Sequence, residues 1–396
     1  MRLVIFLFFL MAFQTSFSQK EERTQQLLNN LQIQIECTEA IDSLYNFKFK
    51  VAEKQFTWLK QQHPDHPLAY FLLGLSQWWK IMPNDQVEDY DPKFYAYMDT
   101  TIDLARELYK IDKKNPEASF FLSAAYGFKA RRLSDHGHYS RAGFASKASL
   151  NYLNENQELD QTYSVEFLFG TALYNYFREW IPENKKFLRP IVMFFPKGNR
   201  DKGIEQLTRV SKEAFYTRIE ALVFLMRIYG SYEDSAKAAL PIAEYLHEQY
   251  PDNSYIHRFL AKTTFYLGNK SAAFEQSMAI LQKVEKRKAG YEAESGRVAS
   301  YIVASHYKSI LNIDSARVYY KQCIKYGNEV DAQEKGYYLS SLYYLGKFAE
   351  EEKKIAEAKY YYEQYLEYES DKKDKHYKTA KKFVKLNKKI ESKKPE

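Results

Sequence analysis

Two matching stretches near the middle of the chain decide the fold: 239-ALPIAEYLHEQYP-251 and 273-AFEQSMAILQKVE-285. They belong to the region 221–281, and in each a large aliphatic residue follows a small one after seven positions. The step from Ala239 to Ala273 is 34 residues, which is the period of a stacked helix–turn–helix repeat. These stretches therefore predict tandem helical hairpins that stack into an array.

The same pattern extends in both directions along the chain, with apolar residues at helical spacing. Second helices of the predicted hairpins carry a small residue, at Ala52, Ala239, Ala273, Ala316 and Ala358. First helices carry a pair of a large and then a smaller residue, at Leu73-Gly74, Leu122-Ser123, Phe169-Gly170, Leu225-Met226, Leu260-Ala261, Val303-Ala304 and Leu345-Gly346. Small residues let paired helices approach closely, so these positions predict the contacts between helices.

The spacing A-x3-F-x2-L-x4-P from Ala52 to Pro64, followed by Leu73-Gly74, resembles the tetratricopeptide repeat. The resemblance covers roughly residues 30 to 370. It implies an all-α, right-handed solenoid of about eight helical hairpins, with residues 19–370 as the array. Such repeats usually bind other proteins, so it also implies a binding function by analogy of fold.

Both ends of the chain differ from the array. Residues 1–18 have the layout of a signal peptide: a basic start, an apolar run over 3–13, and Ser16 and Ser18 before a cut at Gln19. The run is shorter than the roughly 20 residues that span a bilayer, and an uncleaved anchor is the alternative. The layout predicts export to the periplasm or cell envelope of a Gram-negative bacterium, and a mature chain with no transmembrane span.

Residues 371–396 are rich in lysine and account for the whole net charge of +7, so the rest of the chain is neutral. A neutral array argues against nucleic-acid binding, because the charge of such a protein should follow its binding face. Tyr377, Ala380, Phe383, Val384 and Ile390 keep one apolar stripe through the lysines. This pattern predicts a capping helix with a solvated outer face, and contact of that face with anionic lipid or an acidic partner is the alternative.

An aromatic row is the first candidate for function. In the repeat family, the position three residues before the small residue of each first helix faces the concave groove. Here the row and its neighbours are Phe71, Trp78, Trp79, Phe120, Phe167, Tyr174, Phe224 (or Val223), Arg258, Tyr301 and Tyr343. The resemblance implies a groove that binds a protein or peptide segment. The alternative is that these rings pack on the next repeat, because stripes at helical spacing are usually core.

An insertion at 181–199 interrupts the array and is the second candidate. Residues 188–196 are bounded by prolines and almost entirely apolar. Such a segment must be buried, dock a partner or touch a membrane surface, and we expect burial against the concave face. With residues 198–203 it is similar to the interrupted hairpin of the tetratricopeptide repeat protein 39 family of eukaryotes, a similarity that implies no residue roles.

Polar clusters give weaker signals. His63 and His66 form one pair and His136 and His138 another, but a metal site needs three or four ligands, so we expect no metal and no cofactor. The carboxylates Glu88, Asp89 and Asp91 lie in a predicted loop, where a solvated linker is the expected role. We expect the two cysteines, Cys37 and Cys323, to be free thiols.

These features predict a non-catalytic scaffold in the bacterial envelope, since no G-x-S-x-G, H-E-x-x-H or Gly-rich phosphate loop is present. Two alternatives stay open. One is a helical-toroid enzyme that cleaves glycosides with paired carboxylates. The other is a carrier of an apolar small molecule, with Trp78, Trp79 and the insertion forming its pocket.

Overall fold

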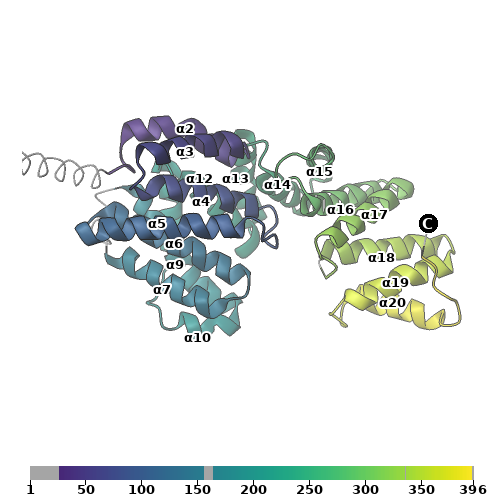
Figure 1. Cartoon of the computed structure of the whole chain (residues 1–396). Helices are drawn as coiled ribbons and strands as arrows, with labels where there is room; N and C mark the ends of the chain where they lie inside the picture. Colours follow the sequence, from purple (N-terminus) through teal and green to yellow (C-terminus); the bar gives the residue numbers. More distant parts are fainter. Residues whose placement is uncertain (1–25, 156–163, 335, 395–396) are drawn as a thin grey trace, which may run out of the picture. The chain divides into compact units, whose positions relative to one another are not determined.

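The computed structural model describes residues 26–155, 164–334 and 336–394, and every regular element within these ranges is a helix (Figure 1). The chain divides into two compact units, Met1–Leu225 and Met226–Glu396, which are described separately below. The expected signal peptide, residues 1–18, lies outside the described residues.

Unit 1 is built from antiparallel helices that pack mainly on their neighbours in sequence. Its helices are α2 (Leu31–Tyr45), α3 (Phe49–Gln62), α4 (Pro67–Ile81), α5 (Asp91–Ile111), α6 (Pro116–Asp135), α7 (Tyr139–Glu155), η1 (Val165–Phe167), α9 (Leu168–Asn184), η2 (Lys186–Leu188), α10 (Arg189–Val192), α11 (Arg200–Glu213) and the start of α12 (Arg218–Arg227).

Unit 2 continues the same pattern. Its helices are η3 (Ile228–Tyr232), α13 (Ala236–Gln249), α14 (Ser254–Tyr266), α15 (Lys270–Glu285), α16 (Ala293–Ser309), α17 (Ile313–Glu329), α18 (Gly336–Glu351), α19 (Ile355–Tyr368) and α20 (Lys375–Leu386). The longer helices from α2 to α19 follow one another as eight sequential pairs among the described residues, and α20 ends the series. The expected all-α solenoid with a capping helix is therefore confirmed.

The small residues of the repeat pattern lie where the pattern placed them. All five alanines of the second helices have no exposed surface: Ala52, Ala239, Ala273, Ala316 and Ala358. In α18, a Cβ atom on Gly346 would lie 2.8 Å from the ring of Tyr362 in α19. Close approach of paired helices therefore depends on these positions, as the spacing predicted.

Helix α20 caps unit 2. Ala380 and Phe383 join the hydrophobic core to which α18 and α19 contribute, while the lysines of α20 are exposed. The segment after α20 turns back onto α19, because the Nζ atom of Lys359 donates to the Ile390 carbonyl oxygen at 2.6 Å. An array end needs such a helix to cover its last apolar face.

The insertion differs from expectation in extent and in burial. Helix α9 continues through Pro182 to Asn184, so the interruption between α9 and α11 covers 185–199. Phe187, Met193 and Phe194 are exposed by 59%, 69% and 84%, so the expected burial against the array is wrong. The physical reason is that α9 binds the backbone of the insertion and leaves these side chains outside.

Candidate functional site

The aromatic row of unit 1 lies in the interior. Phe71, Phe120 and Phe167 are each at most 8% exposed and come from α4, α6 and η1. Their rings contact edge to face, with centroids 6.4 Å apart for the first pair and 5.3 Å for the second. This geometry is favourable between aromatic rings, so the row holds successive first helices together.

Trp79 joins the start of unit 1 to its end. The indole is fully buried, and its Nε1 atom donates to the Glu220 carboxylate of α12 at 2.6 Å. The hydroxyl of Tyr45, in α2, donates to the same oxygen at 3.2 Å. Trp78 packs beside it on Phe128, with ring centroids 5.4 Å apart. Trp78 and Trp79 therefore pack among the helices of unit 1, and the alternative of an apolar carrier stays a hypothesis.

The other members of the row also pack on neighbouring helices. Phe224 contacts Phe169 edge to face; Arg258 donates to the Ser295 hydroxyl at 2.9 Å; Tyr301 stacks on Tyr337; Tyr343 stacks on His376; and Tyr174 donates to the Pro196 carbonyl oxygen. Only Tyr174, Phe224 and Tyr301 of the ten keep intermediate exposure. The contacts of these residues are thus with neighbouring helices of the chain, and their binding of a partner stays a prediction.

Two buried glutamates hold backbone N–H groups in unit 1. Glu117 accepts from the amides of Leu27 and Leu28, at 3.1 and 2.7 Å, and contacts the His66 Nε2 atom at 2.9 Å. Glu166 accepts from three successive amides that precede α12, those of 215, 216 and 217. Charge-assisted hydrogen bonds of this kind fix chain segments in place. Both carboxylates therefore act as structural clamps.

An open polar cavity of about 620 Å³ lies in unit 1 beside α5, α6 and the start of α7. Its lining consists of three carboxylates, two histidines, two cations, a tyrosine and a leucine: Glu88, Asp91, Asp99, His136, His138, Lys129, Arg141, Tyr95 and Leu133. Burial, followed by the nearby Asp91 charge, raises the pKa of the Tyr95 hydroxyl, so this group is a neutral hydrogen-bonding group at pH 7.

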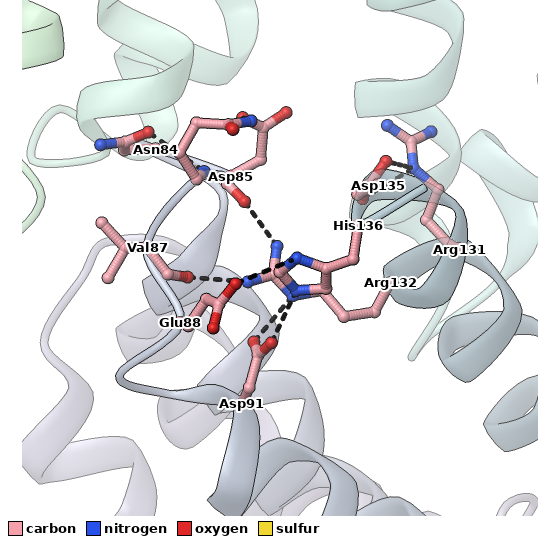
Figure 2. Close-up of polar contacts among 10 residues, drawn as sticks. Asn84, Asp85, Val87, Glu88, Asp91, Arg131, Arg132, Asp135 and His136 are labelled. Carbon is pink, nitrogen blue, oxygen red and sulfur yellow. Dashed lines mark hydrogen bonds and ion pairs between the residues drawn. The ribbon is translucent and has the colours of Figure 1, made fainter. Parts of the chain in front are cut away.

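Arg132 fixes one wall of this cavity (Figure 2). Its side chain has no exposed surface, and its Nε atom donates to the Asp91 carboxylate at 2.7 Å. The two Nη atoms donate to the carbonyl oxygens of Asp85 and Val87, at 2.6 and 2.7 Å. The planar guanidinium thus holds the loop between α4 and α5 on α6, with a fork of donors that lysine lacks.

His136 lies between two carboxylates at the cavity. Its Nε2 atom is 2.7 Å from Asp91 Oδ2, and its Nδ1 atom is 3.5 Å from Glu88 Oε1. In the sequence the carboxylates and this histidine are separate loop features, and the structure brings them together. This proximity could have been predicted from topology, because α5 and α6 are antiparallel and the loop before α5 therefore lies at the same end of the hairpin as the end of α6.

The two histidine pairs lie in separate parts of unit 1, one between α3 and α4 and the other between α6 and α7. Among the described residues, no group of three or more His, Cys, Asp and Glu side chains could hold a metal ion. His66 instead caps α4 by accepting from the Leu68 amide at 3.2 Å. Cys37 and Cys323 are free and buried, as expected, and burial raises the pKa of each thiol to about 12. No helix in the described ranges has the length and apolar character to cross a membrane.

Comparison with known proteins does not assign this chain to a family, so its class is defined by its own helices. No protein-family model matches the chain, and no curated protein matches its sequence. Among solved structures, a "Circular tandem repeat protein with novel repeat topology and enhanced subunit contact surfaces" aligns with 90% of this chain and 91% of its own, at 11% identity and a TM-score of 0.24. The paired helices and their buried alanines define a helical-repeat protein of the α-solenoid type.

Proposed function

We propose that this protein is a non-catalytic binding scaffold with tetratricopeptide-like repeats, and that the polar cavity of unit 1 binds a segment of a partner protein. Helical-repeat folds commonly serve as binding surfaces, which supports the class of function by analogy. The proposed binding site is at α5–α7 rather than along the aromatic row, because most side chains of that row are packed inside their unit.

The observation that carries the proposal is the contrast between a fixed wall and an exposed rim. Arg132 is buried and donates hydrogen bonds to three groups, so the wall is held before any partner arrives. Glu88, His138 and Arg141 are exposed at the rim. A site that is already ordered loses little conformational entropy when it binds.

The charges of the lining indicate the chemistry of the partner. Both carboxylates and cations line the cavity, and Asp99 already pairs with Lys129 there. Such a surface favours a polar peptide segment with charged groups of both signs, because each group can meet its opposite. An apolar helix bound in the cavity would remove water from these charges without giving them partners, and burying unpaired charges is unfavourable.

Affinity capture with charge-reversed variants tests the proposal. The full chain is expressed in its native envelope and captured, and co-purifying proteins are identified by mass spectrometry. We expect Arg141→Glu to reduce recovery of the partner at least about tenfold, a loss of roughly 1.4 kcal/mol in binding. Lys113→Glu, an exposed reversal elsewhere in unit 1, should leave recovery unchanged. Equal recovery with both variants would contradict a site at this cavity.

A helical-toroid hydrolase is the second candidate. It is favoured by the contact of α2 and α4 with α12 through Glu220, and by the grouping of Glu88, Asp91 and His136 at one cavity. Paired carboxylates are the usual groups of glycoside cleavage. The buried Glu117 and Glu166 do not serve this role because backbone amides occupy their oxygens.

An assay of glycoside cleavage distinguishes the scaffold from the hydrolase. A scaffold shows no turnover of a panel of polysaccharides, and Glu88→Gln changes only partner binding. A hydrolase shows turnover that Glu88→Gln abolishes while the variant remains folded, and this outcome would replace the scaffold proposal.

The proposed setting is the cell envelope of a Gram-negative bacterium. This rests on the basic start, the apolar run over 3–13 and the small residues before Gln19. Mass measurement of the protein recovered from its native cell should give a first residue at Gln19. A mass that retains Met1 would contradict cleavage at this position.

A further inference from the structure

The insertion after α9 presents large apolar side chains to solvent. Phe187, Met193 and Phe194 are exposed by 59%, 69% and 84%. We call these three residues the insertion surface. The insertion lies against α7, where the Phe187 ring packs on Tyr139 with centroids 5.0 Å apart. Large apolar side chains that are exposed together in one segment indicate an interaction site.

The backbone of the insertion is held firmly behind these side chains. The Tyr174 hydroxyl donates to the Pro196 carbonyl oxygen at 2.5 Å, and Arg178 donates through Nε and Nη2 to the Phe195 carbonyl oxygen. A Cβ atom on Gly198 would lie 2.5 Å from the Asn175 carbonyl oxygen, so glycine allows the chain to approach α9 closely. The apolar side chains are therefore displayed by a fixed support.

The charge of the segment is of one sign. Residues 185–197 contain four cations and no carboxylate, namely Lys185, Lys186, Arg189 and Lys197, and all four side chains are exposed. In Figure 1, α10 lies at the margin of unit 1, next to α7 and α9. The segment thus combines protruding apolar groups with charges that are all positive, in contrast to the mixed charges of the cavity.

We propose that the insertion surface docks unit 1 on an anionic lipid membrane. Phe187, Met193 and Phe194 enter the boundary between headgroups and acyl chains, and the four cations bind lipid phosphates. The segment is too short to cross a bilayer, so contact is peripheral. A second copy of this chain is a poorer occupant, because it would bring two surfaces of the same positive sign together.

Vesicle co-sedimentation tests this proposal. The chain is purified from a host that expresses the full sequence, and it is mixed with vesicles of phosphatidylcholine alone or with about 30% phosphatidylglycerol, which gives the surface a negative potential. We expect binding to the anionic vesicles that weakens as salt is raised. The triple variant Phe187→Ser, Met193→Ser, Phe194→Ser should lower the partition coefficient at least about tenfold, because each side chain contributes apolar area.

Matched variants show which surface is responsible. Leu31→Ser with Ile35→Ser removes two exposed apolar side chains elsewhere in unit 1 and should leave vesicle binding unchanged. Replacing Lys185, Lys186, Arg189 and Lys197 by Gln should remove the preference for anionic vesicles. Far-UV circular dichroism of each variant should equal that of the unchanged chain, because every substituted side chain is exposed.

Three outcomes would overturn the proposal. The first is equal sedimentation of the unchanged chain with and without anionic vesicles. The second is that the triple variant still binds anionic vesicles whereas a variant with Lys→Gln changes in α20 does not, which would assign the membrane contact to that helix. The third is self-association in solution that the triple variant abolishes in the absence of lipid, which would make the surface an interface between copies.

Discussion

Arg132 and Asp91 form a salt bridge at 2.7 Å, and the arginine side chain in this pair has no exposed surface. The contact joins α6 to the first residue of α5, 41 positions earlier in the chain. Because a buried guanidinium is stable only when its donors are paired, the loop between α4 and α5 has to take the conformation that supplies them. The shape of the polar cavity follows from this requirement.

Arg132→Met should reduce the free energy of unfolding by about 3–5 kcal/mol, because Asp91 and two carbonyl oxygens lose their partner. The neighbouring Arg131 provides the control: it pairs with Asp135 and its side chain is 37% exposed, so Arg131→Met should change stability by less than about 1 kcal/mol. Urea denaturation followed by circular dichroism measures both. Similar losses for the two variants would contradict the role assigned to burial.

Gly346→Ala should reduce the free energy of unfolding by about 1–3 kcal/mol. The added Cβ atom would lie 2.8 Å from the Tyr362 ring, which is held by a hydrogen bond from its hydroxyl to Glu350. Gly336→Ala, in the same helix, meets nothing within 4 Å and should have little effect or stabilise slightly. Thermal denaturation distinguishes the two, and an unchanged melting temperature for Gly346→Ala would refute close packing at this pair.

Unit 2 should become less stable as pH falls from about 6.5 towards 4. Burial, helped by the Lys283 charge, lowers the pKa of His247 to about 4, and burial together with His247 and Lys283 lowers that of His257 to about 3. The two rings stack with centroids 4.2 Å apart. An unfolded histidine has a pKa of about 6.5, so in this range the unfolded chain binds protons that the folded chain does not.

The measurement is the free energy of unfolding from urea titrations between about pH 7.5 and 4, a range that spans the unfolded histidine pKa. His257→Leu should show a smaller decrease below about pH 6.5 than the unchanged chain, whereas His138→Gln, at an exposed position, should show the same decrease. Above about pH 7 the histidine pair is neutral in both states and contributes no pH dependence. Identical pH profiles for His257→Leu and the unchanged chain would disprove this assignment.

Glu117→Gln should loosen the start of unit 1. The carboxylate accepts from the amides of Leu27 and Leu28, and hydrogen bonds to a charged group contribute about 1.5–3 kcal/mol each. We expect hydrogen exchange at these amides and in the first turn of α2 to be at least about tenfold faster. Glu107→Gln, on the exposed face of α5, is the control. Unchanged exchange in the Glu117→Gln variant would show that the clamp is dispensable.

Most of the fold could be predicted from the sequence because it depends on local spacing. Small residues such as Ala239 and Ala273 recur at the repeat period and are buried where helices meet. The apolar stripe of α20 likewise identifies its buried face through Ala380 and Phe383. These features need only the 3.6-residue period of the helix and the size of the side chain.

The candidate site could not be predicted in the same way. Asp91 and His136 lie 45 residues apart, and their contact depends on how α5 packs on α6, where α5 begins and where α6 ends. The buried Arg132 carries no periodic signal, because its role is set by carbonyl oxygens that the loop presents to it. The predicted burial of the insertion was wrong for a related reason. Its composition shows that the segment is apolar, but the hydrogen bonds that Tyr174 and Arg178 donate to its backbone decide which side faces solvent.

The most direct test of the central claim places a photo-reactive amino acid at the cavity rim. The group replaces His138, which is exposed at the rim, in one variant and Lys113, exposed elsewhere in unit 1, in another, and each is illuminated in the native envelope. If the cavity binds a partner segment, a discrete cross-linked product forms from position 138 and not from position 113, and Arg132→Met reduces its yield. Equal products from both positions, or none from position 138, would contradict a binding site at this cavity.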